Sequence, residues 1–251
     1  MPIPDAWRGR LRCPVIAAPM FLISTPALVI ECCRAGVVGT FPALNRRSTA
    51  GYAEWLSEIG AALGTAPDAV PYGVNLVVHR SNARLAADLG ETVRHRVPLV
   101  ITSLGLDADL IREVHGYGGF VFHDVTSPRH ADRALAAGVD GLIAVTQGAG
   151  AHAGALNPFA LLGELRARFD GPLALGGAIA TGAQVLAAQV MGADLAYVGS
   201  RFIATEESAA AQEHKRMILD GGAEDVVLTP QVSGLPANFL RASLRAAGLD
   251  P

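Results

Sequence analysis

The sequence has little charge, and this shortage argues against one class of partner. Asp, Glu, Lys and Arg make up 17% of the 251 residues, and the formal net charge is −3. Nucleic-acid-binding proteins carry clustered basic residues that neutralise phosphates, so we expect no nucleic-acid partner. Hydrophobic residues make up 51% of the chain. The composition therefore predicts a globular protein with a large core that acts on small molecules.

Cysteine is also scarce, and its pattern excludes two uses. Cys13, Cys32 and Cys33 are an odd number and have no C-x-x-C spacing. They predict free, mostly buried thiols rather than a disulfide framework or a metal site. No His and carboxylate residues cluster at the spacing of metal ligands, and no Ser-His-Asp signature is present. We therefore expect no bound metal.

The N-terminus lacks the apolar core segment of a secretory signal, which predicts a cytoplasmic protein. Residues 171–193 contain no charged side chain and are long enough to cross a bilayer. However, Pro172, Gly176, Gly177 and Gly182 interrupt this stretch. A buried strand, a turn and a packed helix explain it better, and we expect no membrane association.

Short apolar runs alternate with segments of helical spacing along the whole chain. Runs rich in Val, Ile, Leu and Phe are typical of strands that are buried on both faces. The predicted strands are 14–20, 37–42, 72–78, 97–105, 119–125, 141–148, 172–179 and 195–203. The predicted helices are 26–36, 51–64, 81–96, 107–116, 128–138, 158–169, 181–192 and 206–222.

Eight strands that alternate with eight helices predict a (β/α)8 TIM barrel. Proline stands at the start of several predicted helices, and glycine marks the end of several, as helix boundaries favour. No linker or charge run divides the chain, so we expect a single domain over residues 1–251 with a short C-terminal segment. A doubly wound open sheet is the alternative, but it usually has fewer strands.

The carboxyl ends of the predicted strands carry the candidate site, because TIM barrels place their chemistry there. Gly176 and Gly177 end the seventh strand, and Gly199 and Ser200 lie towards the end of the eighth. Loops at these two positions often bind phosphate, and glycine lets backbone N–H groups approach the oxygens. The same glycines could also be simple strand-end turns with nothing bound.

Two histidines and one asparagine are further candidates. His152 lies in 146-TQGAGAHAG-154, a stretch too rich in glycine to need a packing side chain, so it is a candidate general acid or base. His123 lies beside Asp124 in the fifth strand, where it either lines the site or is a satisfied barrel histidine. Asn75 interrupts a buried strand and needs hydrogen-bond partners, from the barrel or from a ligand.

In this order, the motifs resemble the nitronate monooxygenase family, also called 2-nitropropane dioxygenases, and the related FMN-dependent enoyl-acyl-carrier-protein reductases. The likeness covers nearly the whole chain. It is carried by 14-PVIAAPM-20, 25-TPAL-28, 73-GVNL-76, 149-AGAHAG-154, 176-GGAIATG-182 and 199-GSRFIATEES-208.

The resemblance implies that the cofactor is FMN and assigns roles to the candidate residues. Ala18, Pro19 and Met20 would lie against the isoalloxazine ring. Asn75 would hydrogen-bond the flavin or its ribityl chain. The loop with Gln147 and Gly150 would pass close to the flavin, and His152 matches the active-site histidine of the family. The phosphate would be held by Gly176, Gly177, Gly199 and Ser200.

The implied reaction is the oxidation of an alkyl nitronate by O2, through the flavin, to a carbonyl compound and nitrite. The first alternative is an FMN-dependent reductase that passes electrons from NAD(P)H to an enoyl thioester or a quinone. The second is a flavin-free, phosphate-binding barrel that acts as an isomerase or lyase, and the third is a non-catalytic binding protein. The sequence leaves the substrate open, and it leaves open whether the protein forms a homo-oligomer.

The chain departs from the family pattern at three places. The loop before His152 is shorter than in many relatives and lacks their glutamate. Asp124 stands where some relatives carry a lysine, so a positive charge that would favour the reduced flavin is absent there. Many relatives also continue beyond the point where this chain ends, with a segment that helps to cover the site.

Overall fold

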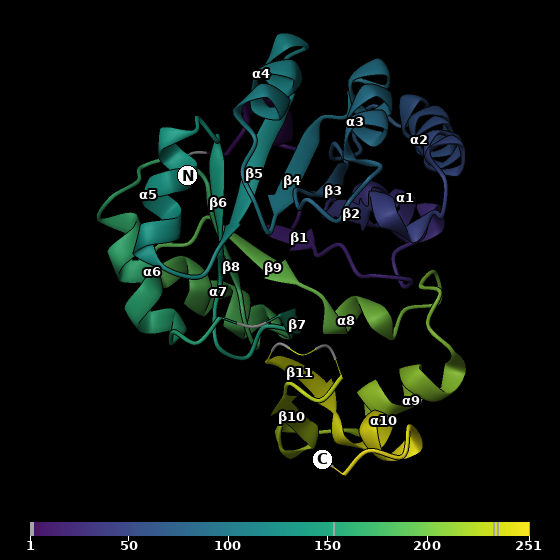
Figure 1. Ribbon diagram of the computed structural model, residues 1–251, viewed down its shortest axis with the longest axis vertical. Helices are drawn as coiled ribbons and strands as arrows, with labels where there is room; N and C mark the ends of the chain where they lie inside the picture. Colours follow the sequence, from purple (N-terminus) through teal and green to yellow (C-terminus); the bar gives the residue numbers. More distant parts are fainter. Residues whose placement is uncertain (1–2, 153, 233, 235, 251) are drawn as a thin grey trace.

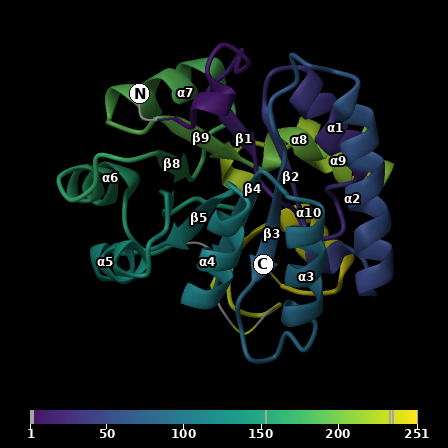
Figure 2. The same cartoon turned by 90° about the horizontal axis from the view of Figure 1, so that it is seen from above.

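The computed structural model describes residues 3–152, 154–232, 234 and 236–250. Parallel strands close a barrel in the order β1-β2-β3-β4-β5-β6-β8-β9, and helices surround it (Figures 1 and 2). The barrel strands are β1 Val15–Ala17, β2 Val38–Pro42, β3 Gly73–Val77, β4 Leu99–Ser103, β5 Phe120–Val125, β6 Gly141–Val145, β8 Leu173–Gly176 and β9 Leu195–Val198. The predicted TIM barrel is confirmed, and each predicted strand contains one of these.

The helices of the barrel follow the predicted order. They are α1 Pro26–Arg34, α2 Thr49–Gly64, α3 Leu85–Arg94, α4 Ala108–Gly116, α5 Pro128–Ala136, α6 Pro158–Arg166 and α7 Gly182–Val190. Proline is the first residue of α1, α5 and α6. The glycines just beyond α1, α5 and α7 have positive φ, a backbone conformation that favours glycine. The uncharged stretch 171–193 forms β8 and α7. Among the described helices, none is long and apolar enough to cross a membrane.

Two boundaries near the C-terminus were predicted wrongly. The eighth strand ends at Val198 instead of continuing to residue 203, and the short helix α8 (Ser200–Ile203) follows it. The last predicted helix begins only at Gln212, as α9 (Gln212–Asp220). Residues 206–211 cannot start it because their backbone bonds the β1–α1 segment: Glu207 O accepts from Thr25 Oγ1, and Ala209 N–H donates to Ile23 O.

The C-terminal residues form a small unit beside the barrel (Figure 1). It contains β10 (Val226–Thr229), β11 (Ala237–Leu240) and α10 (Arg241–Ala246), for which the sequence pattern gave no signal. β11 pairs antiparallel with β10 and with β7 (Ala151–His152), a short strand inside the glycine-rich loop that follows β6. The C-terminal unit is therefore hydrogen-bonded to the loop that carries His152.

The barrel has two apolar cores, and they reveal which way each strand residue faces. One lies inside the barrel and includes Ile16, Phe122 and Ala174. The other fills the space between strands and helices and includes Val121 and Val125. Trp7 precedes β1 and enters the inner core from the amino ends of the strands, with its ring centroid 5.8 Å from that of Phe122. This end of the barrel is closed, so the opposite end is left for function.

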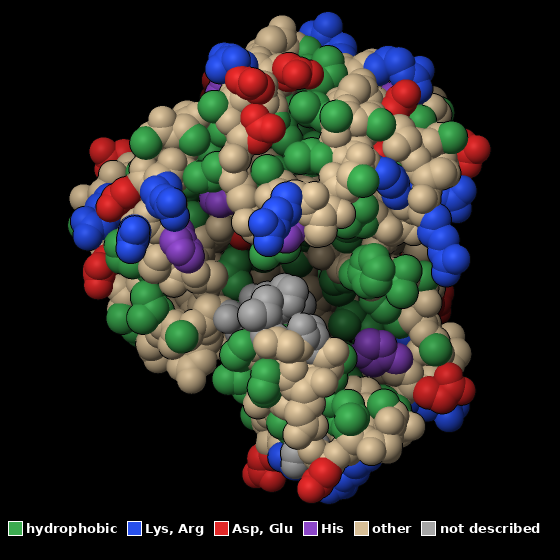
Figure 3. Space-filling model, viewed as in Figure 1, with side chains coloured by type: hydrophobic (Ala, Val, Ile, Leu, Met, Phe, Trp, Pro, Cys, Tyr) green, Lys and Arg blue, Asp and Glu red, His purple; other side chains and the backbone are tan. Residues whose placement is uncertain are grey.

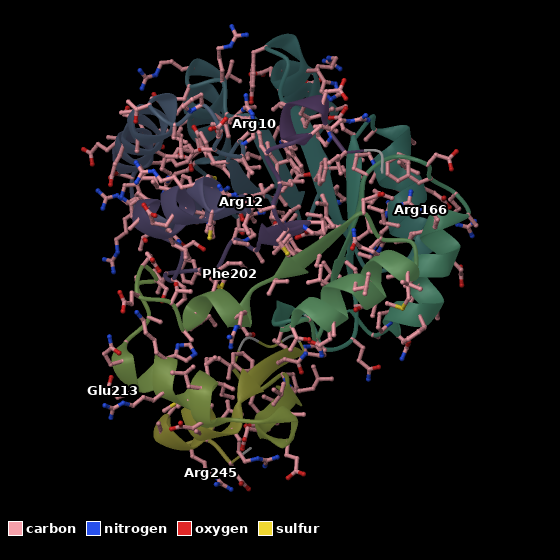
Figure 4. The ribbon with its side chains drawn as sticks, turned by 180° about the vertical axis from the view of Figure 1, so that it is seen from behind. Arg10, Arg12, Arg166, Phe202, Glu213 and Arg245 are labelled. Atoms are coloured by element: carbon pink, nitrogen blue, oxygen red, sulfur yellow. The ribbon has the colours of Figure 1, made fainter. Side chains whose placement is uncertain are left out.

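Arg166, at the end of α6, ties together the turns at the closed end of the barrel (Figure 4). Its guanidinium donates to the carbonyls of Phe169, Gly171 and Gly192, and lies 2.6 Å from Asp194 Oδ2. The same carboxylate oxygen accepts from Leu173 N–H. These bonds connect the segments that enter β8 and β9.

Arg166→Met should therefore lower the free energy of unfolding by about 2 kcal/mol, because it leaves a buried carboxylate without its cation in a partly exposed pair. Urea denaturation followed by circular dichroism measures this. Arg168→Met is the matched control: its ion pair with Glu164 spans 3.9 Å on the surface, so its loss should cost less than about 0.5 kcal/mol. Equal effects of the two substitutions would contradict the structural role of Arg166.

Candidate active site

The strand registers arrange the inward-facing residues in layers. Each step of a circuit around the barrel goes from one residue to its partner on the next strand and then one residue towards the carboxyl end. A circuit of such steps that starts at Ile16 leads back to Ile16. In such a barrel, alternate strands contribute the four side chains of one layer. The layer at this height contains Ile16, Gly73, Phe122 and Ala174. Two residues further along the same strands, the next layer contains Ala18, Asn75, Asp124 and Gly176.

We call this second set the mouth layer, because it lies at the carboxyl ends of the strands. It contains three residues that the sequence predicted to bind the cofactor: Ala18, Asn75 and Gly176. Their side chains are small or polar, whereas Ile16 and Phe122 in the layer beneath are bulky and fully buried. The barrel is thus packed at the level of Ile16 and lined by small side chains at its mouth.

Asn75 hydrogen-bonds the barrel wall with one end of its amide. Nδ2 donates to Ile101 O at 3.1 Å and to Ser103 Oγ at 3.0 Å, both on β4. Among the described residues, none donates to Oδ1. The wall therefore fixes the orientation of the amide, and the acceptor oxygen is available to a ligand N–H or O–H.

The loop after β1, which holds Pro19 and Met20, is fastened by Asn45. The Asn45 amide accepts from Leu22 N–H at 2.8 Å and donates to the carbonyls of Met20 and Ser24. Met20 N–H donates to Ser24 Oγ. Leu22 has φ 61°, a left-handed conformation that side chains disfavour, so these bonds hold a strained turn. Asn45 lies after β2, and the sequence gives no sign of its role, because no local pattern reveals a contact between two loops.

Asn45→Ala should weaken the binding of a ligand over the Met20 loop by about tenfold, since the turn would relax once its three side-chain hydrogen bonds are lost. Fluorescence titration with FMN measures the affinity. Ser48→Ala is the control. It removes the N-cap of α2 and should lower the free energy of unfolding by about 1 kcal/mol, but it leaves the Met20 loop intact. An unchanged FMN affinity in Asn45→Ala would show that the turn does not depend on this side chain.

The two glycines at the end of β8 are explained partly by the fold itself. Gly177 has φ 149°, and a Cβ on it would lie 2.2 Å from Thr146 Oγ1. Thr146 in turn donates through its N–H and Oγ1 to Gly176 O, and Ala178 N–H donates to Gly148 O. Glycine at 177 is therefore required by the contact between the β8 end and the loop after β6, whether or not a phosphate binds.

Gly199 differs, because the fold alone does not require glycine there. Its φ of −105° suits any residue, and a Cβ would find Met20 Sδ at 3.7 Å and Ala18 Cβ at 3.9 Å, ordinary contact distances. Gly199 is the N-cap of α8, and the exposed Ser200 is its first residue. The structure thus brings Gly199 to the residues predicted to face the flavin.

The glycine-rich loop after β6 is held by more hydrogen bonds than its sequence suggests. Its residues Ala151 and His152 form β7 and pair with Asn238 and Ala237 of β11. Asn238 Nδ2 donates to Ala149 O at 2.7 Å, and Gln147 N–H donates to Leu156 O. The loop is therefore anchored from both sides. Gly150 is exposed, and a Cβ there would meet nothing within 4 Å. The side chain of the predicted catalytic residue, His152, lies outside the described part of the structure.

His123 faces away from the mouth. It shares its side of β5 with Val121 and Val125, which belong to the core beneath the helices. Its Nδ1 lies 2.8 Å from Thr102 Oγ1. Burial lowers the pKa of His123 to about 4, and the charge of His130 on α5 acts in the same direction. Of the two alternatives for His123, the structure supports a satisfied, neutral barrel histidine.

Asp124 is the site residue whose position the sequence did not reveal. It follows Phe122 by two residues and therefore faces the interior, in the mouth layer. Its Oδ1 is buried and has no hydrogen-bond partner among the described residues. Burial raises the pKa of this carboxyl to about 7. Tyr197 lies one layer below on β9, and burial, with the charge of Asp124, raises the pKa of its phenol well above the usual range.

The mouth of the barrel faces the C-terminal unit, and the molecular surface is hollowed between the two, with hydrophobic side chains around the hollow (Figure 3). Among the described residues, no group of three or more His, Cys, Asp or Glu side chains could hold a metal ion. The described part of the mouth thus offers the Asn75 acceptor oxygen, the backbone at Gly199 with no side chain over it, and the ionisable carboxyl of Asp124.

Comparison with known proteins identifies the relatives of this chain. The profile of the family described as nitronate monooxygenase matches residues 9–246. A nitronate monooxygenase of Paraburkholderia phytofirmans is 27% identical, over 95% of this chain and 76% of the relative. The structure of a nitroalkane oxidase from Streptomyces ansochromogenes superposes with a TM-score of 0.82 at 26% identity, over 94% of this chain and 79% of the other.

One similar protein has a different substrate class in its name. It is a (3aS,4S,5R,7aS)-5-hydroxy-7a-methyl-1-oxo-octahydro-1H-indene-4-carboxyl-CoA dehydrogenase of Rhodococcus jostii, 28% identical over 92% of this chain. The chain spans 63% of that relative, less than two thirds of its length.

Proposed function

Since the chain belongs to the nitronate monooxygenase family and is a flavin-dependent oxidoreductase, we propose that it oxidises small alkyl nitronates with O2, using FMN, to a carbonyl compound and nitrite. The observation that carries this proposal is the mouth layer. Its small side chains lie above a fully packed barrel, next to the open backbone at Gly199. We propose residues 1–251 as one FMN-binding domain.

The residues of the mouth fit a flavin in three respects. Asn75 offers Oδ1, which accepts from no described residue, to an N–H of the ring or a hydroxyl of the ribityl chain. Ala18 and the backbone of Pro19 and Met20, which Asn45 holds through the Met20 carbonyl, would form the edge against which the ring lies. The backbone N–H groups at Gly177, Gly199 and Ser200 would approach the phosphate, because the two glycines have no side chain in the way.

Bound FMN supplies the chemistry, by accepting electrons from the substrate and passing them to O2. The protein positions the substrate and controls charge. His152 would hydrogen-bond the anionic nitronate, or accept the α-proton when the substrate is a neutral nitroalkane. Gln147 and Gly150 would form the part of the loop that lies beside the flavin. β11 would hold this loop in place through its pairing with β7.

The test begins with an absorption spectrum of the purified protein. Flavin bands, together with nitronate-dependent O2 uptake and nitrite release, would support the proposal. Protein that neither contains FMN nor binds it when it is added would contradict it.

A reductase is the second candidate, and the dehydrogenase of a CoA thioester among the relatives favours it. In that function NAD(P)H would reduce the flavin, and an enoyl thioester or quinone would accept the electrons. Bleaching of the flavin by NADPH without O2, followed by reoxidation on adding a thioester, would identify it. Membership of a flavin oxidoreductase family argues against a flavin-free isomerase or lyase and against a non-catalytic role.

A further inference from the structure

Asp124 is the only ionisable side chain among the four residues of the mouth layer, and the proposed function assigns no role to it. It projects from the carboxyl end of β5 into the barrel, level with Ala18, Asn75 and Gly176. Its Oδ1 is buried without a hydrogen-bond partner among the described residues. An unpaired buried carboxyl oxygen is costly, so a fold that retains one merits an explanation.

No described group around Asp124 compensates its charge. By register, the layer below contributes Thr40, Ile101, Ile143 and Tyr197, and the layer above contributes Pro42, Ser103, Val145 and Gly199. The only titratable group among them is the Tyr197 phenol, which stays neutral. The neighbouring His123 faces the helices, and the His152 side chain lies outside the described residues. In the part of the chain that the structure describes, Asp124 has no salt bridge.

The isolation of Asp124 makes its charge sensitive to a ligand. Burial raises the pKa of the carboxyl to about 7, so near neutral pH small changes in the surroundings decide whether it holds a proton. A negative charge placed nearby, in an interior of low dielectric, would favour the protonated form further.

We propose that Asp124 faces the bound flavin from inside the barrel and takes up one proton from solvent when the flavin takes up electrons. This inference rests on the proposed function, because it requires that the mouth binds flavin. Two electrons and one proton pass to the flavin ring, the electrons from the substrate and the proton to the ring nitrogen N5, so that the ring retains one negative charge. A second proton passes from water to the Asp124 carboxylate. The resulting neutral acid offers an O–H to an acceptor of the reduced ring, and so Asp124 neutralises charge that no nearby cation offsets.

The test measures how many protons the holoenzyme takes up per flavin reduced, as the slope of its reduction potential against pH from about pH 5 to 9. Above neutral pH, the wild type should take up about one proton more than Asp124→Asn, because the amide cannot accept it. Below neutral pH the two should converge, since Asp124 is already protonated. The spectrum of the oxidised flavin should also titrate near neutral pH in the wild type but not in Asp124→Asn.

Two controls separate Asp124 from its neighbours. Tyr197→Phe and His123→Asn should both keep the additional proton and the spectral titration, since neither group changes charge near neutral pH. Asp124→Ser, which is smaller and also cannot ionise, replaces Asp124→Asn if the amide variant does not fold. A wild type with the same proton uptake as these non-ionising variants would overturn the inference. A wild type that binds no flavin would instead overturn the proposed function.

Discussion

His152→Ala should retain FMN but lose about 10²–10⁴-fold of the turnover with nitronate, the usual contribution of a positioned acid or base. FMN should stay bound because the loop is held through its backbone: β7 pairs with β11, Asn238 binds Ala149 O, and the β8 end binds Gly148 O. None of these bonds uses the imidazole. Steady-state O2 uptake and the flavin content of the purified variant measure the two effects separately.

A second substitution distinguishes the two roles of His152. His152→Gln can still donate a hydrogen bond to an anion but cannot accept a proton at neutral pH. It should keep part of the activity with nitronates and lose nearly all activity with neutral nitroalkanes. His130→Ala, on the exposed surface of α5, is the control and should change neither activity. Full nitronate turnover in His152→Ala would remove this histidine from the mechanism.

The barrel could be predicted from the sequence because each of its strands is buried on both faces. A run such as 97-VPLVITSLG-105 can be recognised as a strand from its own residues, without knowledge of the strand it pairs with. Proline and glycine mark the ends of the helices between such runs. The prediction was weakest where an element depends on a distant contact. β7 is only Ala151–His152 and exists because β11 pairs with it, although the two lie far apart in the chain. A local pattern of glycine and alanine cannot show this.

Burial on both faces made the strands recognisable in the sequence, but it also meant that the sequence could not show which side chains face the interior of the barrel. In 120-FVFHDV-125, apolar residues occupy both faces, so the period-two alternation that would separate inside from outside is absent. The sequence therefore could not show which of the two neighbours, His123 or Asp124, faces the interior of the barrel. The register resolves them, because Phe122 lies in the inner core and Val121 and Val125 in the outer one. The more familiar catalytic residue type, histidine, proved to be the one that faces the helices.

Gly199→Leu should weaken FMN binding by about 5- to 150-fold, because overfilling a packed site costs about 1–3 kcal/mol and each 1.4 kcal/mol is a factor of ten. The protein should still fold, since a Cβ at residue 199 makes only ordinary contacts with Met20 and Ala18 and the backbone is not left-handed. Gly177 could not serve for this test, because any side chain there collides with Thr146 in the empty protein.

Gly199→Ala should therefore keep the thermal stability of the wild type and lose a smaller part of the FMN affinity. Gly199→Ala and Gly199→Leu together test how the loss of affinity depends on the size of the side chain. Gly163→Ala on α6, where a Cβ meets nothing within 4 Å, is the matched control and should leave FMN affinity unchanged. Fluorescence titration measures the affinity, and thermal unfolding without FMN measures the fold. If Gly199→Leu binds FMN as tightly as the wild type, the phosphate does not lie against residue 199. If the affinity falls while the empty protein unfolds at the same temperature, the glycine is retained for the ligand and not for the barrel.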